Sequence, residues 1–196
     1  MSVNSILFYR DFVVASGGHQ KVFDYFGYLE REPKYSPSIS FSNSTVWDSN
    51  NPWFPTYQKN QVSFDPAKYD ALFLGGMDWV KYQSVGVDQR IPVINLIQHV
   101  RHGQPNQLLS HFLSHKAIRI CVSREVETAI LDTGVVNGPT FAIPNGVVVP
   151  RLDHLPKKLD VFISGLKRPD LARVLQTKLK AKSISVDVED TRIPRE

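Results

Sequence analysis

Short apolar runs alternate along the chain with segments in which apolar residues recur every three or four positions. Each short run has the length of a buried strand, and each longer segment has the spacing of an amphipathic helix. Val22, Phe26 and Leu29, for example, follow Gly18 at helical spacing. The runs that we predict as strands are 5–9, 38–42, 69–74, 93–98, 117–122 and 140–143. This alternation predicts the α/β class, with an open, mostly parallel sheet and helices on both faces.

A change of composition after the segment IPNGVVVP predicts a second region. Residues 150–158 contain two prolines and mixed charges, which is typical of a linker. The chain then has the pattern of a strand, a helix with Pro169 at its first position, and another strand. We therefore predict a first domain over 1–149, a linker over 150–158 and the incomplete start of a second domain over 159–196. So short a βαβ piece cannot bury a core alone.

The composition is that of an ordinary globular protein, with 42% hydrophobic residues. The longest apolar runs, such as IPVINLI, are far shorter than the roughly 20 residues that cross a membrane. The first residues lack the basic start and the cleavage site of a secretory signal, so we expect a cytoplasmic protein. The single cysteine, Cys121, lies in the apolar run IRICV, which predicts a buried and unreactive thiol.

The net charge of +4 is unevenly distributed. Residues 1–150 contain 12 basic and 12 acidic residues, whereas 151–196 contain 11 basic and 7 acidic residues. A local basic excess can attract phosphates, nucleic acid or an anionic membrane face, although a solvated helix face is the commoner meaning. We expect no nucleic-acid partner, and a peripheral contact with the inner face of a membrane stays open.

The turn SGGHQ joins the first strand to the first helix. It lacks the spacing of the dinucleotide-binding fingerprint and of the phosphate-binding P-loop. Gly17 and Gly18 have no Cβ atoms and would let a ligand approach the backbone, and a helix N-terminus favours an anion. These two residues and His19 are therefore candidates for phosphate binding. The alternative is that the glycines serve only the geometry of a tight turn.

Three further segments follow predicted strands at the carboxyl edge of the sheet, where open α/β folds bind ligands. Asp78 follows LFLGG, His99 follows the strand over 93–98, and Asn145 lies in the turn IPNGV. His99 could transfer a proton or stabilise charge, and Asp78 is the second catalytic candidate. Each of these residues could also be purely structural.

The segment between 43 and 61 is rich in Asn, Ser, Pro and aromatic residues and predicts an exposed loop. Trp53 and Tyr57 are candidates for stacking on a sugar or an acyl chain of an acceptor. The alternative is that these rings pack the loop onto the body. Two pairs of histidines have spacings compatible with a metal, but no cysteine or carboxylate cluster completes a shell, so we expect no metal.

Taken together, these segments resemble the N-terminal domain of retaining glycosyltransferases of the GT-B fold, specifically the family-4 type (glycosyl transferases group 1). The residues that carry the resemblance are the turn over 16–23, YDALFLGG, PVINLIQH ending in His99, ICVSREVETAIL and the IPNGV turn. LDVFISGLKRPDLARVLQTKL is similar to the start of that family's C-terminal, donor-binding domain. The resemblance covers nearly the whole chain but only about half of the usual enzyme.

The resemblance implies two Rossmann-like domains and a nucleotide-diphosphate sugar as substrate, with no other cofactor. Gly17 and Gly18 would face the donor phosphates, and His99 would lie near the transferred sugar. Lys167 and Arg168 are similar in placement to the basic pair that neutralises the leaving diphosphate. The acceptor would be a glycan or a lipid-linked saccharide. The paired-glutamate segment that holds the donor in this family is not found in the 196 residues, so we expect a shortened chain.

Two functions from different classes follow. In the first, the chain belongs to a sugar transferase that acts with retention of configuration. In the second, it is a non-catalytic module that binds a saccharide, a nucleotide or a protein with the same edge of the sheet.

Overall fold

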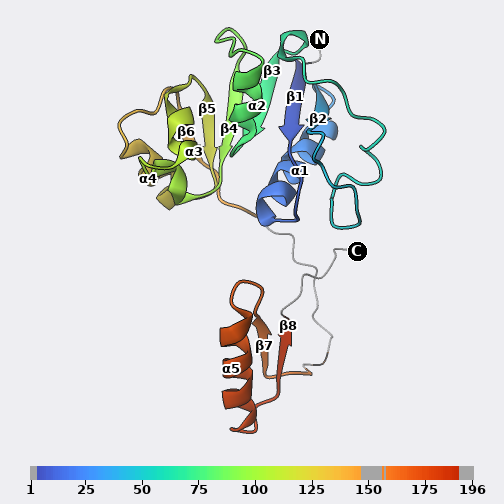
Figure 1. Cartoon of the computed structure of the whole chain (residues 1–196), viewed down its shortest axis with the longest axis vertical. Coiled ribbons are helices and arrows are strands. Elements are labelled where there is room, and N and C mark those ends of the chain that lie inside the picture. Colours follow the sequence, from blue (N-terminus) through green and yellow to red (C-terminus); the bar gives the residue numbers. More distant parts are fainter. Residues whose placement is uncertain (1–3, 147–155, 157, 190–196) are drawn as a thin grey trace. The chain divides into compact units, whose positions relative to one another are not determined.

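The computed structural model describes residues 4–146, 156 and 158–189 (Figure 1). The chain divides into two compact units, 1–146 and 147–196. The predicted first domain ended at residue 149, and most of the predicted linker over 150–158 lies outside the described residues.

Unit 1 contains β1 (Asn4–Arg10), α1 (Gly17–Glu30), β2 (Tyr35–Phe41), η1 (Pro66–Lys68), β3 (Ala71–Gly75), α2 (Asp78–Ser84), β4 (Val93–Ile97), η2 (Val100–Gly103), α3 (Leu108–His111), η3 (Phe112–Ser114), β5 (Ile118–Cys121), α4 (Arg124–Leu131) and β6 (Thr140–Ala142). Unit 2 contains β7 (Val161–Ser164), α5 (Pro169–Lys180) and β8 (Val186–Glu189). All six strands predicted for the first domain are present, with ends that differ by a few residues.

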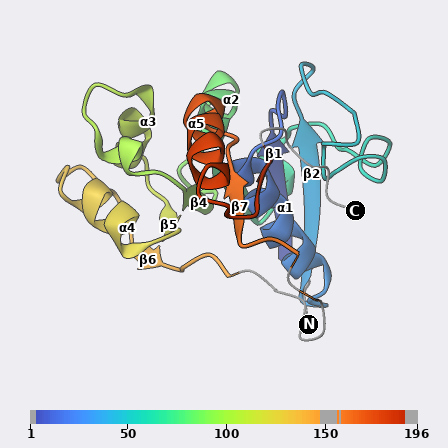
Figure 2. The same cartoon turned by 90° about the horizontal axis from the view of Figure 1, so that it is seen from below.

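Unit 1 is built on a six-stranded sheet with the order β2-β1-β3-β4-β5-β6. Each neighbouring pair of these strands is parallel. Both views place α1 beside β1 and β2, and α4 beside β5 and β6 (Figures 1 and 2). The predicted α/β class with an open, Rossmann-like sheet is therefore confirmed.

The side chains of β1 alternate between two apolar clusters, one on each face of the sheet. Phe8 packs with Val22 and Phe26 of α1 on one face. Leu7 packs with Trp79 of α2 on the opposite face. Side chains of a strand point alternately to the two faces, so a run of consecutive apolar residues such as ILFY requires a cover on each side.

The order of the strands places a topological switch between β1 and β3. The chain leaves β1 toward β2 on one side and returns to β3 on the other side. The connections therefore diverge at the carboxyl ends of β1 and β3, which opens a crevice there. This edge is the place where the sequence predicts ligand-binding residues.

Unit 2 is a single βαβ element, in which β7 and β8 pair in parallel. A Cβ atom on Gly165 would lie 2.6 Å from the Cβ of Ala172, so glycine lets α5 cross close to the end of β7. Pro169 occupies the first turn of α5, as predicted. The side chains of Phe162, Leu171 and Val174 are 60%, 54% and 53% exposed.

The expectation that Trp53 offers its ring to an acceptor is wrong. Its side chain is 0% exposed and packs against Phe23, Phe26 and Phe41. The segment over 43–61 therefore folds back onto the face covered by α1, which is the alternative considered above. Burial of an indole ring removes more apolar surface from water than any other side chain could, so Trp53 anchors the segment.

In the part of the chain that the structure describes, no helix has the length and apolar character that crossing a bilayer requires.

Candidate functional site

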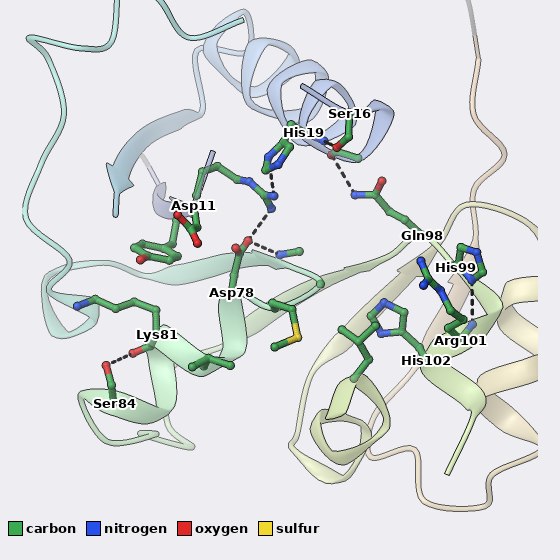
Figure 3. Close-up of a pocket in the computed structure, with 18 residues that line it drawn as sticks. Asp11, Ser16, His19, Asp78, Lys81, Ser84, Gln98, His99, Arg101 and His102 are labelled. Carbon is green, nitrogen blue, oxygen red and sulfur yellow. Dashed lines mark hydrogen bonds and ion pairs between the residues drawn. The ribbon is translucent and has the colours of Figure 1, made fainter. Parts of the chain in front are cut away.

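A cavity of about 670 Å³ opens at the carboxyl edge of β1, β3 and β4 (Figure 3). Four of the residues predicted from the sequence line it together: Gly18, His19, Asp78 and His99. They come from three different strand ends and lie up to 81 positions apart, from Gly18 to His99. A cavity therefore lies where open α/β folds bind ligands, at the carboxyl ends of the parallel strands.

The start of α1 forms one wall of the cavity. Ser16 caps the helix, and its Oγ accepts a hydrogen bond from the N–H of His19 at 3.4 Å. Gln98, which follows β4, donates from Nε2 to the carbonyl oxygen of Gly18 at 3.2 Å. A Cβ atom on Gly18 would lie 3.1 Å from Oε1 of Gln98, so a larger residue would displace that amide.

The two glycines of the turn are not equivalent. Gly18 lines the cavity, whereas Gly17 is exposed and is not among the lining residues. A Cβ atom on Gly17 would meet nothing within 4 Å. The close approach that requires glycine is therefore made by Gly18.

Arg10, the last residue of β1, links two of the predicted residues. Its guanidinium donates from Nη1 to Oδ2 of Asp78 at 2.7 Å and from Nη2 to Nδ1 of His19 at 2.9 Å. The backbone N–H of Gly75 donates to the same carboxylate oxygen at 2.8 Å. A Cβ atom on Gly75 would lie 2.9 Å from Nη1 of Arg10, so this glycine leaves room for the guanidinium.

Asp78 is buried, with 4% of its surface exposed. Removal from water raises the pKa of this carboxyl to about 6, and the neighbouring Arg10 charge opposes that shift. Asp78 is therefore ionised at neutral pH and occupied by an ion pair. It is placed to fix Arg10 and, through Arg10, His19, rather than to exchange a proton with a ligand.

His19 is a neutral hydrogen-bond donor. Burial, followed by the charge of Arg10, lowers its pKa to about 4. Because Nδ1 accepts from Arg10, the ring proton lies on Nε2. His102 also lines the cavity, and burial lowers the pKa of its ring to about 4.

His99 begins η2 as its N-cap and is exposed to the cavity. Its Nδ1 accepts a hydrogen bond from the N–H of Arg101 at 3.0 Å. In the neutral ring, the proton is therefore on Nε2, which leaves a second imidazole donor at this site.

The cavity carries an excess of positive charge. Its charged side chains are those of Arg10, Asp11, Asp78, Lys81 and Arg101. Since Arg10 and Asp78 neutralise each other, two cations remain against one carboxylate. Together with the imidazole donors and the start of α1, this balance favours an anionic group such as a phosphate.

The other predicted binding residues lie elsewhere. Asn145 is exposed after β6 and does not line this cavity. Lys167 and Arg168 belong to unit 2, where they line a separate hollow of about 420 Å³ with Gly165. Tyr57 is half-buried, and its hydroxyl donates to Oε2 of Glu30 at 2.7 Å. Burial raises the pKa of this phenol, and the hydrogen bond to Glu30 adds to the shift.

Neither metal nor thiol chemistry is indicated in the described residues. No cluster of three or more His, Cys, Asp or Glu side chains that could hold a metal ion is found there. The prediction for Cys121 is confirmed, because the thiol is 0% exposed and burial raises its pKa to about 11.

Comparison of the sequence with models of protein families and with curated proteins finds no match. The features that bear on the chemistry of the site are therefore those of the cavity itself: a glycine at a helix start, the imidazole donors of His19 and His99, and a positive balance of charge.

Proposed function

We propose that this chain belongs to a glycosyltransferase of the GT-B type, which transfers a sugar from a nucleotide-diphosphate donor to an acceptor with retention of configuration. In this proposal, the acceptor is a glycan or a lipid-linked saccharide, and transfer takes place in the cytoplasm or at the inner face of a membrane. The single observation that carries the proposal is that Gly18, His19 and His99 meet around one cavity at the switch point of a parallel sheet.

The reaction makes a demand that the cavity can meet. The bond between the anomeric carbon of the sugar and the diphosphate oxygen breaks, and an acceptor hydroxyl oxygen bonds to that carbon. The hydroxyl proton leaves with the diphosphate. Negative charge grows on the leaving phosphate, where fixed hydrogen-bond donors and cations lower the barrier. The Nε2 atoms of His19 and His99 and the guanidinium of Arg101 are such groups.

Asp78 has a supporting part in this scheme. Its ion pair with Arg10 fixes the guanidinium, which in turn holds the ring of His19 with its proton on Nε2. We therefore replace the expectation that Asp78 is a catalytic acid or base with a positioning role.

A matched pair of glycine variants tests the donor site. In Gly18→Val, the new side chain enters the contact with Gln98 and the edge of the cavity, so affinity for UDP, GDP or ADP should fall at least tenfold. In Gly17→Val, the same side chain points into open space, and affinity should stay within twofold. Calorimetric titration of the folded variants measures both. Equal affinities of the two variants would contradict a phosphate site at Gly18.

The same titration separates the two classes of function. Nucleotide binding that depends on Gly18, without transfer of a sugar from any nucleotide conjugate to a glycan or a lipid-linked acceptor, would assign the chain to the non-catalytic binding modules.

A further inference from the structure

We propose that Asp11 is the residue that binds the saccharide in this cavity, by accepting a hydrogen bond from a sugar hydroxyl, and that the saccharide is uncharged at that position. This inference rests on the proposed function, since it names the class of acceptor that the same cavity would take.

Two carboxylates line the cavity, and only one of them is free to meet a ligand. Asp78 is buried and bound to Arg10 and to the backbone of Gly75. Asp11 is exposed, and its Oδ2 has no hydrogen-bond partner among the described residues. A carboxylate with one open oxygen in a concave site is a strong acceptor for a hydroxyl group.

The carboxylate of Asp11 is held in place from its other oxygen. The hydroxyls of Ser42 and Ser44 both donate to Oδ1, the latter at 2.8 Å. The segment that carries these serines is itself tied to the end of β1, because the N–H of Ser42 donates to the carbonyl of Arg10 at 2.9 Å. The group is therefore oriented before any ligand arrives, which lowers the entropic cost of binding.

The position of Asp11 also divides the cavity into two electrostatic ends. In Figure 3, Asp11 and Lys81 lie on one side of the cavity, whereas His99 and Arg101 lie on the other side. The negative charge of Asp11 also acts on Tyr9, which lines the same cavity. The pKa of this phenol is raised, mainly by burial and next by the charge of Asp11. Near His99 and Arg101, no carboxylate of the described lining residues offsets the cation, so an anionic group is favoured there. On the other side, the carboxylate of Asp11 offsets the charge of Lys81 and repels an anion next to it, so a neutral hydroxyl fits at Asp11.

The test uses the 196-residue chain and three neutral probes, methyl α-glucoside, methyl α-mannoside and methyl α-galactoside, with glucuronic acid as a charged counterpart. Amide NMR shifts are followed with and without UDP. We expect at least one neutral glycoside to shift Asp11, Ser42 and Ser44 saturably, and glucuronic acid to bind more weakly. Asp11→Asn should weaken the binding of that glycoside about tenfold, because a hydrogen bond to a charged acceptor is replaced by a neutral one.

Asp48→Asn is the matched control, since Asp48 is also exposed but does not line the cavity. It should leave glycoside binding unchanged. Ser44→Ala should give a smaller loss than Asp11→Asn, because it removes only one of the two hydroxyls that orient the carboxylate.

Three outcomes would overturn the inference: no binding of any neutral glycoside, binding of glucuronic acid as tight as that of the neutral sugars, or unchanged binding by folded Asp11→Asn. Failure of the proposed function is recognised separately. Glycoside binding that depends on Asp11, together with no affinity for UDP, GDP or ADP, would support the saccharide site and reject the nucleotide-sugar donor.

Discussion

The two units follow the same βα pattern and differ in how much of it they bury. In unit 1, the side chains of Leu7, Phe8 and Leu72 are 0% exposed. In the described part of unit 2, only Ala172 and Val186 are buried apolar side chains, while Phe162 and Leu171 are more than half exposed. The alternating apolar pattern thus produces strands and helices in both units. The six-stranded sheet of unit 1 has apolar side chains packed on both of its faces, whereas the two-stranded sheet of unit 2 is too small to bury its own.

The charges differ in the same way. The ion pair of Arg10 and Asp78 in unit 1 is buried, with side chains 10% and 5% exposed. The pair of Arg168 and Asp170 in unit 2 has side chains 64% and 61% exposed. Water screens the second pair and not the first, so unit 1 depends on its charges and unit 2 does not.

The largest expected effect comes from the buried ring of Trp53. Trp53→Ala should reduce the free energy of unfolding of unit 1 by about 3–5 kcal/mol, because it leaves a cavity among packed aromatic rings. Phe162→Ala in unit 2 should change stability by about 0.5 kcal/mol or less. Denaturant titrations followed by amide NMR measure each unit separately. Similar losses for both variants would break the comparison.

The next effect concerns the ion pairs. Asp78→Asn should destabilise unit 1 by about 3 kcal/mol, since it leaves the buried charge of Arg10 without its partner. Asp170→Asn in unit 2 should leave the unfolding transition where it is, because both partners are exposed. Denaturant titration of the two variants decides the matter. A shift for Asp170→Asn as large as that for Asp78→Asn would show that exposure does not separate the units.

A smaller effect depends on pH. The folded pKa of His19, about 4, lies below the ordinary value of 6.5. Between these values the unfolded chain binds more protons, so this contribution to stability is complete above pH 6.5 and is lost as the pH falls to about 4. After solvent screening we expect about 1–2 kcal/mol. Asp78, whose folded pKa is raised, acts in the opposite direction over part of this range.

Imidazole NMR resolves the histidine contribution by itself. The ring of His19 should remain neutral at pH 5.5, and His19→Gln should remove its share of the pH dependence. Residues 158–189, which contain β7, α5 and β8, have no histidine, so the amide signals of these three elements should show no such change. A His19 ring that titrates near 6.5 would contradict the hydrogen bond to Arg10 as the state of this residue.

Much of the fold and part of the site could be predicted from the sequence. The strand ends indicated Gly18, His19, Asp78 and His99, because parallel strands bring their carboxyl ends to one edge. The role of Arg10 could not be predicted: the only signal was a charge at the end of the apolar run ILFY, and its partner Asp78 is 68 positions away.

The same limit explains the remaining differences. In the sequence, nothing distinguishes Asp11 from any other acidic residue after a strand. Its carboxylate is oriented by Ser42 and Ser44, which the fold brings beside it from the segment after β2. The burial of Trp53 depends on how a segment without periodicity folds over α1, which no local pattern encodes. Local periodicity therefore predicts elements and edges, whereas contacts between distant residues decide which side chains at an edge are free.

The most direct test of the proposed donor site is an amide NMR titration of the 196-residue chain with UDP, GDP, ADP and their sugar conjugates. The proposed donor site predicts saturable shifts with at least one of them at Gly18, His19 and His99 in unit 1. No saturable shift with any of these nucleotides in a folded sample, or shifts that leave Gly18 and His99 unaffected, would contradict it.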